Sequence, residues 1–165
     1  MNRESNEQPK GARNQKASST FEELEVYQVA REFRMAMYRV AKHLPESEKF
    51  GLASQIRRAA VSLTNNIAEG HGRYHYLEQI KFMLQSRGSL EELIDDLNIC
   101  VDENYLPEVE IAPLKENGWR VRQLIDGYVR YLRSRKAANA VGECSPPYGN
   151  VDADHLTSLD LTNYE

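Results

Sequence analysis

Apolar residues recur at intervals of three and four in four separate stretches of the chain, the spacing of an amphipathic helix. The stretches cover residues 21–43, 52–68 and 74–103, and a fourth that begins near Pro107 or Pro113 and runs to about Ser134. The positions expected to face inward are Val26, Ala30, Phe33, Met37, Val40 and Leu44; Leu52, Ile56, Ala59 or Ala60, Leu63 and Ile67; Leu77, Ile80, Leu84, Leu90 or Leu93, Leu97 and Val101, widened by Met83, Ile94 and Cys100; and Leu114, Val121, Ile125, Tyr128 and Leu132. No stretch shows a convincing strand alternation.

Short connections separate the four predicted helices. Pro45 ends the first, because the residue before a proline is pushed out of the helical region. Gly70 and Gly72 are expected to stop the second by adopting the left-handed cap conformation, and Pro113 is expected to break or kink the fourth near its start. Because short connections favour antiparallel neighbours, the pattern predicts an all-α, up-down-up-down four-helix bundle.

The two ends of the chain lack this periodicity. Residues 1–20 are polar, and residues 137–165 carry five acidic side chains and no Lys or Arg. We expect both ends to be disordered, which leaves residues 21–136 as one bundle domain. That domain holds 17 basic and 18 acidic residues, and a near-neutral domain can still carry a basic face. We expect the acidic tail, Gly142–Glu165, to compete with an anionic ligand for that face.

Composition places the chain among soluble globular proteins. Hydrophobic residues make up 41% of it, and the formal net charge is −4. No apolar run approaches the roughly 20 residues that span a bilayer, and the polar N-terminus lacks the apolar core of a secretory signal. Two cysteines, Cys100 and Cys144, form no disulfide or metal framework. These features favour a cytoplasmic protein with no membrane partner.

No motif indicates catalysis or a cofactor. His71 and His75 are four residues apart, with Glu69 and Glu78 nearby, but a turn separates them and they do not form the helical H-E-x-x-H pattern of a zinc site. An acidic cluster in the third helix is interpreted as a solvated face: Glu91, Glu92, Asp95 and Asp96. Nucleophile, phosphate-loop and dinucleotide motifs are absent from the sequence. We therefore expect no enzyme activity, no metal and no cofactor.

Basic residues on the second and third helices are the candidate binding groups: Arg57, Arg58, Arg73, Lys81 and Arg87. The two helices are expected to be antiparallel neighbours, so these side chains could converge on one surface. Guanidinium groups bind phosphate bidentately, and Tyr74 and Tyr76 nearby could stack on unpaired bases.

Two alternatives remain open for this region. The same arginines could instead form salt bridges, within the bundle or between subunits, to Glu69, Glu91 and Asp95. The small residues Ser86, Gly88 and Ser89 could form a notch that seats another helix or subunit, because an interior glycine usually marks a close neighbour. In either case the protein would be a structural or protein-interaction module.

Segments of the first three helices, in order, carry a resemblance that covers Phe21 to Leu132. They are FEELEVYQVA in the first helix, SQIRRAAVSL with NIAEG in the second, and GR followed by SRGSLEEL in the third. With these segments the chain resembles the bacterial four helix bundle protein family, also called the 23S ribosomal RNA intervening-sequence protein family. One departure is Thr64-Asn65, where the family pattern leads us to expect Pro-Ala; without the proline the local helix should be less kinked.

The resemblance implies an antiparallel four-helix bundle that assembles as a homopentameric ring and has no catalytic activity. Some members are encoded within insertions in the large ribosomal RNA gene. Related proteins look like accessory factors of diversity-generating retroelements, in which a basic surface binds nucleic acid and reverse transcriptase. We therefore predict a non-enzymatic oligomer that binds structured RNA or nucleoprotein through a cationic surface on the second and third helices. A reverse transcriptase partner is implied by family analogy only.

Overall fold

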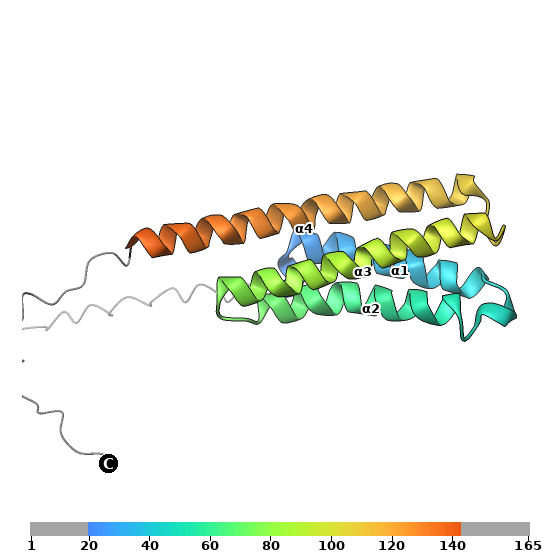
Figure 1. The fold of residues 1–165 in the computed structure, drawn as a ribbon, viewed down its shortest axis with the longest axis horizontal. Helices are drawn as coiled ribbons and strands as arrows, with labels where there is room; N and C mark the ends of the chain where they lie inside the picture. The colour runs from blue at the N-terminus through green and yellow to red at the C-terminus, as the bar shows by residue number, and fades with distance from the viewer. Residues whose placement is uncertain (1–19, 143–165) are drawn as a thin grey trace, which may run out of the picture.

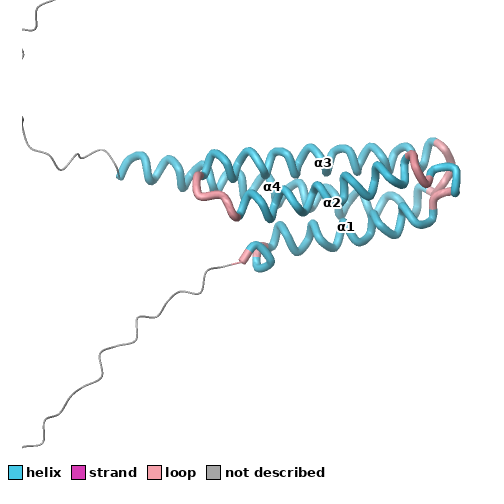
Figure 2. The backbone as a smooth tube through the Cα atoms, turned by 90° about the horizontal axis from the view of Figure 1, so that it is seen from below, coloured by secondary structure: helices cyan, strands magenta, loops and turns pink. Residues whose placement is uncertain are grey.

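Four long helices make up the fold in a computed structural model, which describes residues 20–142 (Figure 1). They are α1 (Glu25–His43), α2 (Leu52–His71), α3 (Tyr76–Asp102) and α4 (Glu108–Gly142), with short 3-10 turns at Phe21–Glu23 and Glu46–Glu48. The connections alternate between the two ends of the molecule (Figure 2). Each helix packs against its chain neighbours, and α4 also packs against α1. The predicted all-α, antiparallel four-helix bundle is thus confirmed. Disorder was expected of residues 1–20 and 137–165, most of which lie outside the described range; for residues 137–142 the expectation is wrong, because they continue α4.

Helix boundaries differ from the predicted ones at three places. The first helix begins at Glu25 rather than Phe21, because the backbone of Leu24 is extended (φ −70°, ψ 125°). Gly72 ends α2 with φ −74°, so the left-handed cap predicted there is wrong. The fourth helix includes Pro113 and continues to Gly142, well past the predicted end near Ser134 and past residue 136. Its last part extends beyond the ends of the other helices (Figure 1).

The inward faces of α1 and α2 contain the residues that the periodicity predicted, and all of them are buried. On α3 the prediction was partly wrong, since Leu77 and Leu84 remain 59% and 42% exposed. That helix faces inward through Ile80 and Met83, which the pattern included, and through Ser86, which it did not. A polar serine on the buried face is the reason, because a pattern that counts apolar residues shifts the stripe toward the leucines.

Small residues let α2 and α3 approach closely. The Ser86 hydroxyl donates a hydrogen bond to the Leu63 carbonyl (2.7 Å). The Ser89 hydroxyl donates one to the Ser62 hydroxyl (2.8 Å). A Cβ on Gly70 would lie only 3.0 Å from the Cβ of Phe82. Ser86 and Ser89 therefore hold α2 and are not open to another subunit, which corrects the predicted notch.

Glu48 holds the α1–α2 connection in place. One of its carboxylate oxygens accepts a hydrogen bond from the Leu52 backbone N–H (2.9 Å), at the start of α2, and the other accepts one from the Tyr105 hydroxyl (3.0 Å), in the α3–α4 connection. Because removal of a helix cap costs about 0.5–2 kcal/mol, Glu48→Ala should lower the free energy of unfolding by about 1–2 kcal/mol in urea denaturation. Glu46→Ala is the control, since Glu46 is exposed and pairs only with Lys49 in residues 20–142. Equal loss in both variants would contradict a specific role for Glu48.

Candidate functional site

A shallow groove runs along the outer face of the bundle where α1 and α2 lie side by side. It consists of two adjoining hollows of about 490 and 530 Å³ that share Tyr38 and Val61. Its lining residues are Arg34, Met35, Tyr38, Arg39, Lys42, Arg57, Arg58, Val61, Ser62, Asn65 and Asn66. We refer to this surface as the α1–α2 groove.

Helix geometry places the basic residues on this face. Arg34, Tyr38 and Lys42 follow one another at intervals of four, so they lie on successive turns of α1. The buried faces of both helices turn toward the core, with Met37 of α1 and Ile56 of α2 fully buried. The cations are consequently directed outward, and the packing of α1 against α2 brings the two sets together.

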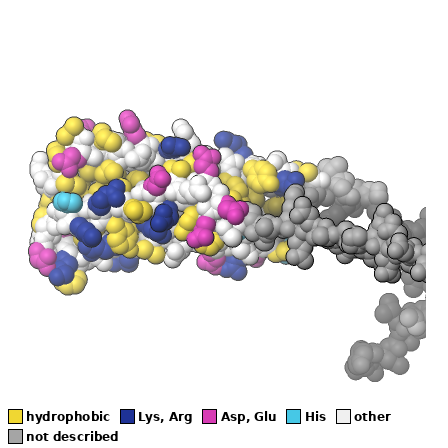
Figure 3. Space-filling view, turned by 180° about the vertical axis from the view of Figure 1, so that it is seen from behind, with side chains coloured by type: hydrophobic (Ala, Val, Ile, Leu, Met, Phe, Trp, Pro, Cys, Tyr) yellow, Lys and Arg dark blue, Asp and Glu magenta, His cyan; other side chains and the backbone are white. Residues whose placement is uncertain are grey.

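The positive charge of the groove has no acidic partner within residues 20–142. No carboxylate of the described residues lines the groove. Five cations do, and they are Arg34, Arg39, Lys42, Arg57 and Arg58. In the described part of the chain their side chains form no ion pair, whereas Arg73, Arg87, Arg120 and Arg122 are all paired. The view onto the α1 side of the molecule shows Lys and Arg side chains gathered there, with hydrophobic ones between them (Figure 3).

The hydrogen bonds of these arginines go to neutral groups. Arg34 donates to the Thr64 hydroxyl (2.9 Å), Arg57 to the Ala41 carbonyl (3.2 Å) and Arg58 to the Ser54 hydroxyl (2.9 Å). Such bonds orient a guanidinium and leave its charge intact. Thr64 stands where the resemblance led us to expect proline, and its hydroxyl is the acceptor that holds Arg34 against α2.

The floor of the groove is apolar. Met35 is 46% exposed and Val61 is 37% exposed, and Tyr38 lies half-buried between them. An apolar floor bordered by cations suits a ligand that carries negative charge together with flat or apolar surface, such as the phosphates and bases of a nucleic acid or an acidic peptide.

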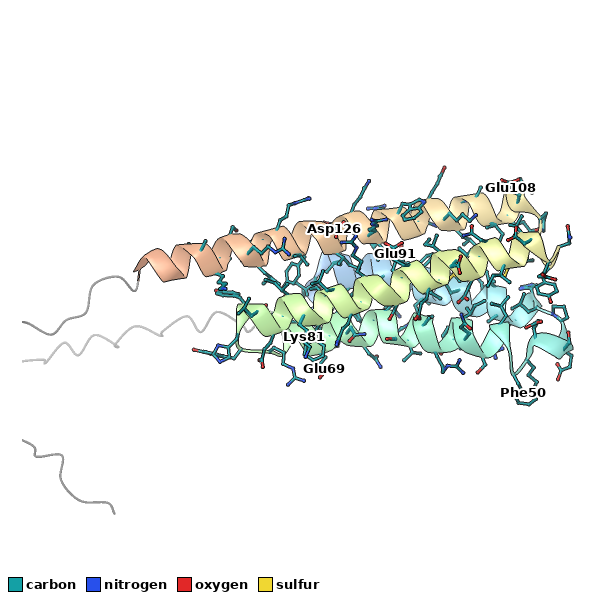
Figure 4. The ribbon with its side chains drawn as sticks, in the orientation of Figure 1. Phe50, Glu69, Lys81, Glu91, Glu108 and Asp126 are labelled. Carbon is teal, nitrogen blue, oxygen red and sulfur yellow. The ribbon has the colours of Figure 1, made fainter. Side chains whose placement is uncertain are left out.

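The five basic residues predicted from sequence do not share one surface. Arg57 and Arg58 line the α1–α2 groove. Arg73 lies at the α2–α3 connection, where it pairs with Glu69 and its guanidinium carbon is 4.8 Å from the centre of the Phe82 ring. Lys81 lies in the second turn of α3, at the same end of the bundle (Figure 4).

Arg87 lies on another side of the bundle. It pairs with Asp126 of α4 (3.2 Å) and with Glu91 (3.9 Å), so it faces the α3–α4 seam (Figure 4). Arg122 joins the same network through Glu91 (3.2 Å). The salt-bridge alternative therefore describes Arg73 and Arg87, whereas no such pair involves Arg57 or Arg58 in residues 20–142.

Sequence reasoning missed three cations of the groove, Arg34, Arg39 and Lys42. The signal was present, because after Glu32 the polar positions of α1 carry basic residues and no acid as far as His43. Proximity along the chain pairs Arg57 and Arg58 with the third helix, whereas in the fold these two side chains face α1.

Asp96 is the member of the acidic cluster that departs most from expectation. It was predicted to be solvated, but its side chain is fully buried. Gln55 donates a hydrogen bond to its Oδ1 (2.8 Å), and Oδ2 has no partner within residues 20–142. Burial, helped by the nearby charges of Glu92 and Asp95, raises the pKa of Asp96 to about 6. It lies between α2 and α3, out of contact with solvent.

Residues 20–142 contain no group of three or more His, Cys, Asp or Glu side chains placed to hold a metal ion. His71 is the last residue of α2, and the ring of His75, at the start of α3, packs edge-on against Tyr74. In the same part of the chain, no helix has the length and apolar content needed to cross a bilayer.

Comparison with known proteins identifies a family. The family described as 23S rRNA-intervening sequence protein matches residues 22–127, more than half of the chain. The match includes α1, α2, α3 and the first part of α4, and with them every residue that lines the α1–α2 groove. No curated protein matches the chain significantly.

Proposed function

The chain belongs to the 23S rRNA-intervening sequence protein family, and from that premise we propose that it is a non-enzymatic protein that binds structured RNA or nucleoprotein through the α1–α2 groove. One observation carries this proposal: five cations border an exposed apolar floor, with no carboxylate among them in the described residues. Charge that is not neutralised within the fold is available to a polyanion.

The groove offers each kind of contact that RNA requires. Arg39, Lys42 and Arg58 would contact phosphates, and guanidinium groups can do so bidentately. Ser62 and Asn65 carry groups that hydrogen-bond to sugars or base edges, and Tyr38 offers a ring against a splayed base. Because phosphate contacts position a ligand without reading its sequence, we expect a preference for RNA shape over RNA sequence.

We also propose that the protein acts in the cytoplasm as a homopentamer, the assembly that the family resemblance implies. A ring would repeat the groove in each subunit, so that weak contacts to one RNA combine into a useful affinity. A reverse transcriptase partner rests on family analogy alone, and the groove chemistry adds nothing specific to it.

The test is binding of a labelled structured ribosomal RNA across a salt series. Arg39→Gln/Arg58→Gln removes two charges from the groove and spares Arg34 and Arg57, whose hydrogen bonds connect α1 with α2. We expect affinity to fall at least ~10-fold. The slope of log affinity against log salt should become shallower by about 2, because each of the two arginines would neutralise one phosphate in the wild-type complex.

A matched variant, Arg73→Gln/Lys81→Gln, removes the same charge from the α2–α3 end. It should retain most of the affinity of the wild-type protein if the groove is the binding surface. No binding by the wild-type protein would contradict the proposed function. Both variants are compared at equal oligomeric mass. Equal losses of affinity in the two variants would show that overall charge, and not the groove, attracts RNA.

A further inference from the structure

We propose that the acidic C-terminal segment, residues 143–165, binds in the α1–α2 groove of the folded protein and competes there with RNA. The inference concerns regulation of the proposed function and rests on the same groove.

A phosphodiester backbone by itself would use only the border of the groove. Its cations match phosphates, but Met35 and Val61 expose apolar surface between them. A nucleic-acid backbone gains little by covering methionine and valine side chains, because its own surface there is charged. A peptide that carries both carboxylates and apolar side chains would satisfy the border and the floor together.

The segment has that composition. It contains five acidic residues and no Lys or Arg, so nothing in it repels the groove. Its apolar residues are interspersed with Asp152, Asp154 and Asp160, and they are Tyr148, Val151, Leu156, Leu159, Leu161 and Tyr164. Alternation at this spacing lets carboxylates meet the bordering cations while apolar side chains cover Met35 and Val61.

The segment is also long enough to reach the groove. Tyr128 of α4 lies beside Val26 of α1, since both line one surface hollow. At 1.5 Å per residue, the end of α4 at Gly142 lies roughly 20 Å beyond that level, and the centre of the groove lies roughly 15–25 Å on the other side of it. An extended chain covers about 3.3 Å per residue, so roughly 14 residues bridge this span. That brings Asp152–Asp160 to the groove.

The positions of the lysines allow docking of the segment to be tested directly, with the full-length protein and without RNA. Lys42 is the one lysine among the groove residues, whereas Lys49 and Lys81 are exposed elsewhere. A carbodiimide forms an amide bond between a carboxylate and a lysine amine that are in contact with each other. We expect cross-links from Asp152, Asp154 or Asp160 to Lys42 in preference to Lys49 and Lys81, found by mass spectrometry. They should disappear in 1 M salt, where the Debye length is about 3 Å, and in Arg39→Gln/Arg58→Gln.

A second measurement ties the contact to function. Asp152→Asn/Asp154→Asn/Asp160→Asn removes the segment's central charges and leaves the described helices unchanged. It should raise RNA affinity by about 3- to 10-fold, the size expected for a few exposed ion pairs. Ser145→Asn/Ser158→Asn is the control without loss of charge and should leave affinity unchanged.

The outcomes separate the two proposals. Cross-links spread evenly over Lys42, Lys49 and Lys81, or absent from Lys42, would overturn the docking of the segment even if RNA binds the groove. Specific cross-links to Lys42 in a protein that binds no RNA would support docking and contradict the proposed function. An unchanged RNA affinity in the triple variant would show that the segment does not compete.

Discussion

Gly118→Leu should lower the free energy of unfolding by about 2–3 kcal/mol, whereas Gly88→Leu should raise it by about 1 kcal/mol. The two glycines lie inside long helices, Gly88 in α3 and Gly118 in α4. The same substitution therefore brings the same gain in helix propensity, and only the surroundings differ.

Those surroundings are opposite. A Cβ on Gly118 would collide with the terminal methyl group of Ile94 and lie 3.3 Å from the ring of Phe33. The end of Ile94 can turn aside for one methyl group, but Phe33 and Ile94 are both buried, and no space remains for the rest of a leucine side chain. A Cβ on Gly88 would meet nothing within 4 Å among the described residues.

Urea denaturation at matched oligomeric mass measures both effects through the midpoint, provided that the slope is unchanged. Gly118→Ala provides an intermediate step and should cost less than leucine. Unchanged stability in Gly118→Leu would mean that α4 can move away from α1 and α3 without loss. A loss of stability or of assembly in Gly88→Leu would mean that another subunit covers the outer face of α3.

These glycines show where sequence reasoning succeeded and where it did not. Periodicity located four helices and the buried faces of α1 and α2, because burial of apolar residues is what the pattern records. It could not say which small residue faces a neighbour. Gly88 was predicted to mark a close approach between helices, but it faces outward. Gly118 lies at such an approach, against Ile94 and Phe33, and the sequence pattern did not predict it. The rotation of each helix decides this, and rotation depends on partners distant in sequence.

The candidate site has the same limit. The sequence displays its cations plainly, but Arg39 and Lys42 become neighbours of Arg58 only when α1 packs against α2. Acidic partners are likewise assigned by packing, which gives Arg87 to Asp126 across the α3–α4 seam. Charge that remains unpaired after folding is a property of the tertiary structure, and for that reason the groove emerged from the structure and not from the spacing of arginines.

As the pH rises from about 4 to about 6, the free energy of unfolding of the wild-type protein should fall by roughly 2–3 kcal/mol relative to that of Asp96→Asn. Burial of the carboxyl group raises its pKa from the ordinary 3.8 to about 6. In that interval the folded state keeps a proton that the unfolded state has already released, so folding becomes less favourable as the pH rises. Above about pH 6 both states are ionised, and the full cost of a buried charge is present.

The asparagine variant isolates this effect because it does not titrate and keeps the oxygen that accepts the hydrogen bond from Gln55. Other carboxylates contribute equally to both proteins, so the difference between their stabilities, measured by urea denaturation from pH 4 to pH 8, reports Asp96 alone. Asp102→Asn serves as the exposed control on the same helix and should change little. A difference that does not vary with pH would mean that water or a rearranged partner reaches Oδ2. A difference that grows as predicted would mean that the fold retains, between α2 and α3, a charge that opposes its own stability.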